Sequence, residues 1–352
     1  MCVMIHHSVS SSWRALSRAS ALGFVLSLLG GCGSTDKFSP SSDIPAVTTA
    51  PGDSAGLADT ASVPTDSALV PTDSTANLAA LTGTQAGIVF GTNQMTTSLL
   101  GSVHTGTLVG GQIDPSNALT WLSGTRAKGG RIVIKMCKGA DSYVKNADGT
   151  FSFTKWKALV DRFRTVNLGP YITDGTILGH FLIDEPHRAA RWGGKIIPQS
   201  TIEAMAKYSK QIWPGMTTFV RVVPSWLAGA PVTYAYLDAA WLQYEAWRGN
   251  VGTVLTSEVA AAKLKRLGLV VGLNVIDGGN GSSNIRGWTS GKYSMSASEI
   301  KTYGSVLLNQ SYSCGFYNWT YDGTYYGRSD IKSAFGELST KAKSHVMTSC
   351  RQ

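Results

Sequence analysis

The chain has 352 residues, with 31 Lys and Arg against 22 Asp and Glu, so its formal charge at pH 7 is +9. A hydrophobic content of 43% excludes a chain that is disordered throughout, and five cysteines are too few for a disulfide-built scaffold. No apolar run of about 20 residues follows the extreme N-terminus, which excludes a polytopic membrane protein. The length allows one large domain or two small ones.

The first 32 residues have the pattern of an export signal. Arg14 and Arg18 make it positive, and an apolar core runs from Ala21 to Leu29. The core ends in Leu29-Gly30-Gly31-Cys32, which resembles the lipobox of bacterial lipoproteins, and that resemblance implies lipidation of Cys32. An ordinary signal peptide with an incidental cysteine is the alternative. With the lipid, the chain is expected to be exported and anchored to a membrane of the bacterial cell envelope.

Residues 33–83 are predicted to form a disordered linker. Ser, Thr, Asp, Ala and Pro dominate this stretch, and Val-Pro-Thr-Asp-Ser occurs twice, at 63–67 and 70–74. Such a composition cannot bury enough apolar surface to offset the chain entropy that folding removes. The globular domain is therefore expected at 84–352.

The predicted domain is more basic than the whole chain. It has 28 Lys and Arg against 16 Asp and Glu, a charge of +12. This excess favours an anionic partner such as an acidic glycan or an envelope surface, and a basic surface that serves only solubility is the alternative. No nucleic-acid-binding motif occurs, so nucleic acid is not expected as a partner. We expect a monomer.

Short apolar runs alternate with helical patterns along the domain. Strands are predicted at 87–92, 131–136, 177–185, 217–223, 240–247, 269–277 and 314–321. Helices are predicted to begin at Asp114-Pro115, to span 154–164, 257–267 and 330–347, and to follow the capping boxes Ser200–Glu203 and Ser296–Glu299. The two capped helices should end before Pro214 and near Leu308, and Gly268 should end the helix 257–267.

Seven visible strands, most followed by a helix, predict an α/β fold. Apolar runs with little alternation indicate a parallel sheet covered on both faces, and a domain of 269 residues suits a (β/α)₈ TIM barrel. The eighth strand is expected in 101–110 or in 165–173. A doubly wound open sheet is the competing fold, and it is disfavoured because no Gly-rich phosphate loop follows the first strand.

The barrel topology predicts a disulfide between Cys314 and Cys350. Cys314 begins the last strand and Cys350 follows the last helix. The helix of a βα unit runs back antiparallel to its strand, so both thiols should meet at the bottom of the barrel, and an oxidising compartment would join them. Cys137 is then left as a buried, unpaired thiol that serves as a small core hydrophobe.

Polar and aromatic residues gather where the predicted strands end. In this fold the active site lies at the carboxyl ends of the strands. Four carboxylates are expected to converge there with Arg221 and Lys135 nearby, and a structural lattice of ion pairs is the alternative. The candidate residues are Lys135, Asp184, Glu185, Arg221, Trp226, Tyr244, Glu245, Asn274, Asp277, Asn318, Trp319 and Asp322.

Carboxylates beside aromatic rings suit a carbohydrate substrate. Trp and Tyr faces stack on pyranose rings, and hydrolysis of a glycosidic bond needs two carboxyl groups. The sequence has no His-x-x-x-His, Cys-x-x-Cys, Gly-x-Ser-x-Gly or Walker motif, and its histidines show no metal-ligand spacing. We therefore expect neither a metal nor a cofactor.

In two short motifs the domain resembles a glycoside-hydrolase-type TIM barrel of the retaining clan A. That clan has an Asn-Glu-Pro-like acid/base motif after its fourth strand, which Ile183-Asp184-Glu185-Pro186 matches, and a Trp on its eighth, which Trp319 matches. The resemblance implies that Glu185 is the acid/base. The sequence departs from the clan's pattern at two positions. Asp184 stands in place of the clan's Asn, and Asp277 stands where the clan has a nucleophilic Glu after its seventh strand. Glu245 is the other candidate for the second carboxylate.

The sequence thus predicts a lipid-anchored glycosidase. Glu185 would protonate the glycosidic oxygen, and Asp277 or Glu245 would attack the sugar or activate water. The sugar would be positioned by Arg221, Tyr244, Asn274, Trp226 and Trp319, with further candidate contacts from Asp184, Asn318, Asp322 and Lys135. The rivals are a non-catalytic glycan-binding surface protein and a structural envelope protein without a small ligand.

Overall fold

The computed structural model describes residues 87–346 and 348–351. The predicted signal peptide (1–32), its lipidation site Cys32 and the predicted linker (33–83) lie outside these residues. Within the described part of the chain, no helix combines the length and the apolar character that a membrane span requires.

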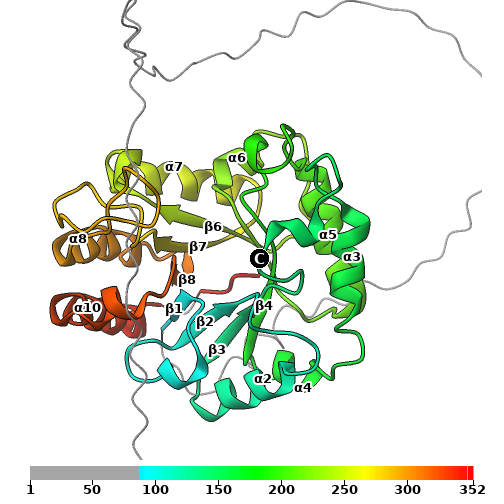
Figure 1. Cartoon of the computed structure of the whole chain (residues 1–352), viewed down its shortest axis with the longest axis horizontal. Coiled ribbons are helices and arrows are strands. Elements are labelled where there is room, and N and C mark those ends of the chain that lie inside the picture. Colours follow the sequence, from blue (N-terminus) through cyan, green and yellow to red (C-terminus); the bar gives the residue numbers. More distant parts are fainter. Residues whose placement is uncertain (1–86, 347, 352) are drawn as a thin grey trace, which may run out of the picture. The chain divides into compact units, whose positions relative to one another are not determined.

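The domain is a closed barrel of parallel strands, each hydrogen-bonded to the next along the chain (Figure 1). The last strand pairs with the first, with Phe90 opposite Phe316, so the predicted (β/α)₈ barrel is confirmed and the open sheet is wrong. The strands are β1 (Val89–Asn93), β2 (Gly106–Val109), β3 (Arg131–Ile134), β4 (Ile177–Asp184), β5 (Thr218–Arg221), β6 (Ala239–Tyr244), β7 (Gly268–Leu273) and β8 (Ser313–Asn318).

Helices surround the barrel and cover the outer face of the strands (Figure 1). The α-helices are α2 (Ala118–Ala127), α3 (Phe153–Asp161), α4 (Gly169–Thr173), α5 (Gln199–Ile212), α6 (Pro224–Ala228), α7 (Val251–Leu264), α8 (Ala297–Leu308), α9 (Gly323–Gly327) and α10 (Ser329–Ser344). Short 3₁₀ helices are η1 (Thr97–Leu99), η2 (Asp141–Val144), η3 (Ala189–Arg191) and η4 (Ala246–Arg248).

The eighth strand, which the hydrophobic pattern did not locate, is β2. It lies in 101–110, the first of the two stretches in which it was expected. It pairs with β1 through Gly91 and Gly106 and continues into β3, whereas 165–173 contains the short helix α4. Gly106 is required there: a Cβ would lie 2.9 Å from the Tyr317 hydroxyl and would also meet Val89. A Cβ on Gly91 would lie 2.5 Å from the ring of the same tyrosine. Tyr317 therefore fills space that both glycines leave open.

One capping box is confirmed and the other is wrong. The Glu299 N–H donates to the Ser296 hydroxyl (3.3 Å) and the Ser296 N–H donates to the Glu299 carboxylate (2.8 Å), so α8 begins as predicted and ends at Leu308. Helix α5 instead begins at Gln199, one residue before Ser200. The carboxylate of Glu203 accepts three backbone N–H groups of 235–237, at 2.8, 2.9 and 3.0 Å, and so binds a neighbouring loop.

Two other helix starts differ from the prediction. Asp114 does not cap α2, which begins at Ala118; its carboxylate pairs with Arg162 at 2.9 Å and ties the preceding turn to α3. Helix α7 begins at Val251, where Asn250 caps it by accepting the Thr253 N–H (3.0 Å). Gly268 opens β7 and does not cap the helix before it.

The hydrophobic core has an inner and an outer part. A cluster drawn from all eight strands fills the barrel and includes Phe181, Phe219, Trp241 and Tyr317. Larger clusters lie between strands and helices, with Trp156 of α3 fully buried in one of them. Since both faces of each strand are covered, the strands carry apolar residues at successive positions, as the sequence indicated.

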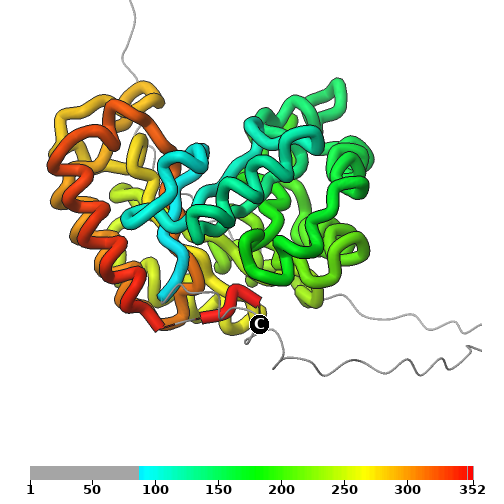
Figure 2. The backbone as a smooth tube through the Cα atoms, turned by 90° about the horizontal axis from the view of Figure 1, so that it is seen from below, coloured from blue at the N-terminus to red at the C-terminus, as the bar shows by residue number. Residues whose placement is uncertain are grey.

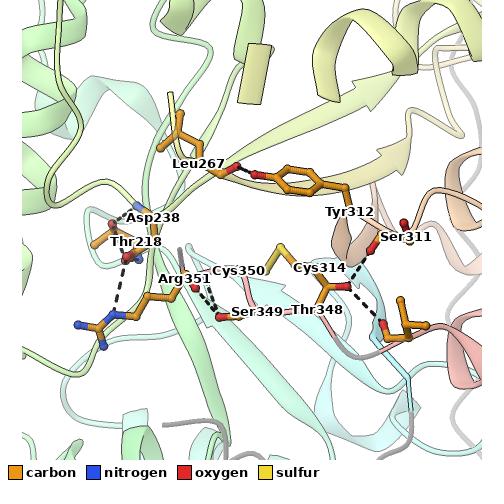
Figure 3. Close-up of a disulfide and its surroundings, with 11 residues drawn as sticks. Thr218, Asp238, Leu267, Ser311, Tyr312, Cys314, Thr348, Ser349, Cys350 and Arg351 are labelled. Atoms are coloured by element: carbon orange, nitrogen blue, oxygen red, sulfur yellow. Dashed lines mark hydrogen bonds and ion pairs between the residues drawn. A yellow bond between two sulfur atoms is a disulfide. The ribbon is translucent and has the colours of Figure 1, made fainter. Parts of the chain in front are cut away.

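The predicted disulfide is confirmed. Cys314 in β8 is bonded to Cys350, with the two Cα atoms 5.1 Å apart (Figure 3). Residues 348–351 lie beyond the end of α10 at one end of the barrel (Figure 2), where Arg351 donates to the Pro214 carbonyl (3.2 Å) and its Nε lies 3.9 Å from Asp238. Cys137 is the buried free thiol that was predicted, and burial raises its pKa.

Removing this disulfide is expected to lower the free energy of unfolding by about 3–4 kcal/mol, because it closes a loop of 36 residues in the unfolded chain. The double substitution Cys314→Ala/Cys350→Ala should show this loss in urea unfolding followed by tryptophan fluorescence. Reductant should destabilise the wild type by a similar amount and leave the double variant unchanged. Equal unfolding midpoints for the wild type and the double variant would contradict the prediction.

Candidate active site

A cavity of about 530 Å³ lies at the carboxyl ends of the strands. It is lined by residues that follow or end β4 to β8, the sector in which the sequence placed most of its candidates. Seven predicted site residues line it: Asp184, Glu185, Arg221, Glu245, Asn274, Asp277 and Trp319. The parallel barrel brings these residues together although they span more than 130 positions of the chain.

A buried ion-pair network forms one wall of the cavity. The carboxylate of Asp184 is bound by the Nε and Nη2 atoms of Arg221, the latter at 3.0 Å, and by Nη1 of Arg191 at 2.8 Å. Burial alone would raise the pKa of Asp184, but the two guanidinium groups hold it well below its usual range. Burial likewise opposes the charge of Arg221, and the Asp184 carboxylate raises its pKa.

Glu185 directly follows β4 and projects into the same network. Its Oε2 pairs with Arg188 (2.8 Å) and Arg191 (2.9 Å), and its Oε1 lies 3.4 Å from Nη2 of Arg221. Its backbone has a φ of 45°, in the left-handed region that costs a non-glycine residue of order 1 kcal/mol. The Glu185 N–H donates to the Arg221 carbonyl (3.0 Å), which holds this unusual backbone against β5.

Glu245 lies at the end of β6 among neutral partners. Its Oε1 accepts a hydrogen bond from the Asn274 amide (2.6 Å) and its Oε2 accepts the indole N–H of Trp247. It forms no ion pair with another described residue. Asn274 extends β7 and bridges to Trp319 at the end of β8, whose ring lies 4.8 Å from the guanidinium carbon of Arg221. Glu245 and Glu185 thus reach one cavity from β6 and β4.

Asp277 lies three residues beyond the bridging position of β7 and is bound by a loop. Its Oδ1 accepts the Thr289 N–H (3.0 Å) and its Oδ2 accepts the Thr289 hydroxyl (2.8 Å). Gly287 passes so close to this carboxylate that a Cβ there would collide with Oδ1. Asp277 therefore holds the loop 287–292, and the residue at the end of β7 beside Trp319 is Asn274.

Asp322 does not join the other three carboxylates, which corrects the expected convergence of four, whereas Lys135 lies near enough for its charge to help lower the pKa of Asp184. Asp322 caps α9 by accepting the Tyr325 N–H (2.8 Å), because its chain turns into that helix directly after β8. The ammonium group of Lys135 donates to the Gly139 carbonyl (3.0 Å) within the loop that follows β3. Both residues lie outside the lining of the cavity.

Three further predicted contact residues also lie outside the cavity lining. Tyr244 points to the outer core, where its hydroxyl donates to the Gly249 carbonyl and burial raises its pKa. Trp226 packs from α6 with its ring centroid 6.1 Å from that of His187. Asn318 is fully buried in β8, and neither atom of its amide has a hydrogen-bond partner among the described residues.

Sequence reasoning missed several residues that line the cavity. Arg191 is the most important of them: it binds Asp141 in two places, at 2.5 and 2.9 Å, and also contacts Asp184 and Glu185. Its signal is the basic stretch His187-Arg188-Ala189-Ala190-Arg191 directly after the Asp-Glu-Pro motif. The other missed lining residues are Arg188, Val222, Val223, Trp241, Arg248, Thr289 and Lys292, whereas His187, Gln243 and Trp247 lie at the ends of predicted strands.

Within the described residues, no group of three or more His, Cys, Asp or Glu side chains is arranged to hold a metal ion. His187 is the histidine that lines the cavity. Its ring packs beside that of Trp226, and burial lowers its pKa.

No protein-family model matches the chain, and no curated protein matches it. Among solved structures it is similar to the β-glucanase SdGluc5_26A from Saccharophagus degradans, with 9% identity over 73% of this chain and 88% of that one and a TM-score of 0.51. It is also similar to a cellulase in complex with an inhibitor, with 11% identity, coverage of 73% and 92%, and a TM-score of 0.50. Xylanase 10B from Thermotoga petrophila has 8% identity, coverage of 74% and 95%, and a TM-score of 0.48. At these identities the likeness concerns the fold alone, a closed (β/α)₈ barrel.

Proposed function

We propose that the chain is a glycoside hydrolase that cleaves its substrate between Glu185 and Glu245. The observation that carries this proposal is the placement of these two carboxylates, from β4 and β6, in the lining of one cavity at the carboxyl end of the barrel. Glycosidic hydrolysis needs such a pair, one to donate a proton and the other to attack or activate water. Asp277 is the weaker candidate for the pair because Thr289 occupies both of its oxygens.

The remaining lining supports a sugar as the substrate. Trp247 and Trp319 offer flat apolar surfaces, and Gln243 and Asn274 offer amides for hydroxyl groups. The Nε2 of Gln243 and the Nε1 of Trp241 are buried donors without a partner among the described residues. A bound sugar hydroxyl would satisfy them and recover the free energy that an unmade buried hydrogen bond costs.

In the proposed reaction Glu185 donates a proton to the glycosidic oxygen, and Glu245 attacks the anomeric carbon or activates a water molecule. Arg191 and Arg221 fix the Glu185 carboxylate, and the hydrogen bonds from Asn274 and Trp247 fix that of Glu245. Each carboxylate is therefore oriented before the substrate arrives, which is how an active site reduces the entropy lost in reaching the transition state.

The test begins with a hydrolysis screen of plant, microbial and algal glycans, followed by Glu185→Gln and Glu245→Gln on a substrate that is cleaved. Both variants should lose about 10²–10⁴-fold in kcat. On an aryl glycoside with an activated leaving group, which departs without protonation, Glu185→Gln should recover most of its glycosylation rate and Glu245→Gln should not. Glu337→Gln, on the exposed surface of α10, is the matched control and should keep full activity. Undiminished hydrolysis by Glu185→Gln would refute the assignment.

A non-catalytic glycan-binding protein is the second candidate. It is favoured by Asn274, which takes the place at the end of β7 where the resemblance to clan A leads one to expect a carboxylate, and by the three guanidinium groups that bind Glu185. This candidate predicts glycan binding without turnover, and binding that Glu185→Gln leaves intact.

We also propose that the chain is exported and anchored through a lipid on Cys32. The support is the Leu29–Cys32 pattern, together with the Cys314–Cys350 disulfide, since disulfides persist mainly in oxidising compartments. In a bacterial host, the wild type should incorporate radiolabelled palmitate and sediment with membranes, whereas Cys32→Ser should do neither. Labelling of both proteins would contradict Cys32 as the lipid site.

A further inference from the structure

Some of the charged side chains that line the cavity at the carboxyl ends of the strands form ion pairs, and others do not. Five Lys and Arg side chains and four carboxylates line it. Arg188, Arg191 and Arg221 all form ion pairs with Asp184 or Glu185. Arg248 and Lys292 form no ion pair with any residue that the structure describes, although Glu245 and Asp277 line the same cavity. The side of the cavity formed by η4 and the loop 287–292 therefore has two positive charges without a counter-ion.

Arg248 has an unmade hydrogen bond. Its Nε is buried and has no partner among the described residues, and its guanidinium carbon lies 4.9 Å from the centre of the Trp247 ring. A buried N–H of a charged group that lacks an acceptor is costly, and a ligand with an anionic oxygen would supply one. The stacking on Trp247 limits the movement of the guanidinium group and so prepares it for that contact.

Lys292 is brought to the same place by the loop that Asp277 holds. The Lys292 N–H donates to the Thr289 carbonyl, and the Gly287 N–H donates to the Lys292 carbonyl, each at 3.0 Å. Thr289 in turn is bound to Asp277. The ammonium group of Lys292 lies 6.0 Å from the centre of the Trp247 ring, so both free cations flank one aromatic side chain.

Trp247 is suited to contact a sugar ring between these cations. It is 66% exposed, the largest exposure among the tryptophans of the described chain, and its indole N–H is fixed on Glu245. An exposed indole that is held at one edge presents a flat apolar face at little cost in side-chain entropy. It also joins the two cations to the carboxylate proposed to act in catalysis.

We propose that Arg248, Lys292 and Trp247 form a subsite for a sugar that carries an anionic group, either the carboxylate of a uronic acid or a sulfate ester. Trp247 stacks on the ring, and the two cations bind the anionic oxygens. Arginine ion pairs neutralise Asp184 and Glu185, and the five cations of the lining outnumber its four carboxylates. The cavity therefore keeps a net positive charge, although Glu245 and Asp277 form no ion pair with a described residue. That the bound sugar is a substrate, and not only a ligand, rests on the proposed hydrolase function.

The test is calorimetric binding to the full chain. The probes are oligogalacturonates and oligomannuronates for the carboxylate, carrageenan oligosaccharides for the sulfate, and cellopentaose and mannopentaose as neutral sugars. The wild type should prefer one acidic class over the neutral sugars, with an affinity that falls as NaCl is raised. Arg248→Gln/Lys292→Gln should reduce that preference by about 10–100-fold. The control is Lys263→Gln/Arg266→Gln, which removes the same charge from a cavity at the opposite end of the barrel and should keep the preference.

The outcomes distinguish the proposed subsite from the proposed hydrolase function. No preference for an acidic oligosaccharide, or an equal loss in the control pair, overturns the subsite. Acidic oligosaccharides that bind through Arg248 and Lys292 without being cleaved support the subsite and count against the hydrolase. Cleavage of neutral oligosaccharides with no preference for acidic ones supports the hydrolase and overturns the subsite. Preference for carrageenan over uronate oligosaccharides, or the reverse, identifies the anionic group.

Discussion

Replacing Arg221 by methionine is expected to lower the free energy of unfolding by about 3–5 kcal/mol. The substitution leaves Asp184 almost fully buried with Arg191 as its remaining cation, and it also removes the contacts of Arg221 with Glu185, Gln243 and Trp319. A buried charge that loses one of its two arginine partners keeps the cost of its desolvation with less attraction to offset it, which is why the loss is large. Urea unfolding at pH 7, followed by circular dichroism, measures it.

Arg188→Met is the matched control for this prediction. Arg188 pairs with Glu185 at 2.8 Å but is 60% exposed, so its removal should change the stability by no more than about 1 kcal/mol. The double variant Asp184→Asn/Arg221→Met, in which both buried charges are absent, should lose less than the sum of the two single variants. Similar losses in Arg221→Met and Arg188→Met would show that the network is not buried as described.

Acidification is expected to destabilise the domain by about 5 kcal/mol between pH 7.5 and 4.5, through two histidines that fold in the neutral form. Burial lowers the pKa of His104 to about 4 and that of His180 to about 3, from 6.5 in the unfolded chain. Because the folded values are lower, the stability that these residues allow above pH 6.5 is lost progressively as the pH falls from 6.5 towards the folded values. The loss is about 1.4 kcal/mol per pH unit for each histidine.

The surroundings of both histidines explain this behaviour. His104 packs against the rings of Phe90, Tyr326 and Phe335, and its Nδ1 has no partner among the described residues. His180 is fully buried in β4, stacked on Trp156, with a hydrogen bond between its Nδ1 and the Ser209 hydroxyl (2.9 Å). No carboxylate contacts either ring in the described structure, so protonation would place an unpaired charge in the core.

The substitution His104→Leu checks this prediction. It should reduce the difference in unfolding free energy between pH 7.5 and 4.5 by about half, since His180 remains. Calorimetry in buffers of different ionisation enthalpy should show the wild type taking up about one proton more than the variant on unfolding at pH 5. An unchanged pH dependence in His104→Leu would contradict the prediction.

The barrel could be predicted from the sequence because most of its strands are nearly continuous apolar runs, and turn-forming residues separate one run from the next. The run of β2 could not be recognised with the same ease, because Gly106 and Thr107 make up half of it and leave only Leu108 and Val109 as apolar residues. Helix starts were predicted wrongly where a residue that could cap the helix instead binds a segment far away in the sequence. Glu203 reaches the loop 235–237, and Asp114 reaches Arg162, contacts that local spacing does not contain.

Part of the candidate site could be predicted once the strands were recognised. Strand ends converge in any parallel barrel, so Glu185, Arg221, Glu245, Asn274 and Trp319 could be placed together from their positions in the chain. The sequence did not show which way each side chain points after the strand ends. Tyr244 and Asp322 follow or end strands as well, yet one turns to the outer core and the other caps a helix.

The packing of Tyr317 has a consequence for how sequences related to this one should diverge. Its ring fills the space over Gly91 and Gly106, at which even a methyl group would collide with it. A lineage that acquires alanine at 106 therefore needs smaller residues at both 89 and 317, whereas alanine at 91 would meet the Gly106 backbone whatever residue stands at 317. Positions 89, 106 and 317 should consequently change together in an alignment while position 91 stays glycine, and this covariation would link β1, β2 and β8 without reference to any structure.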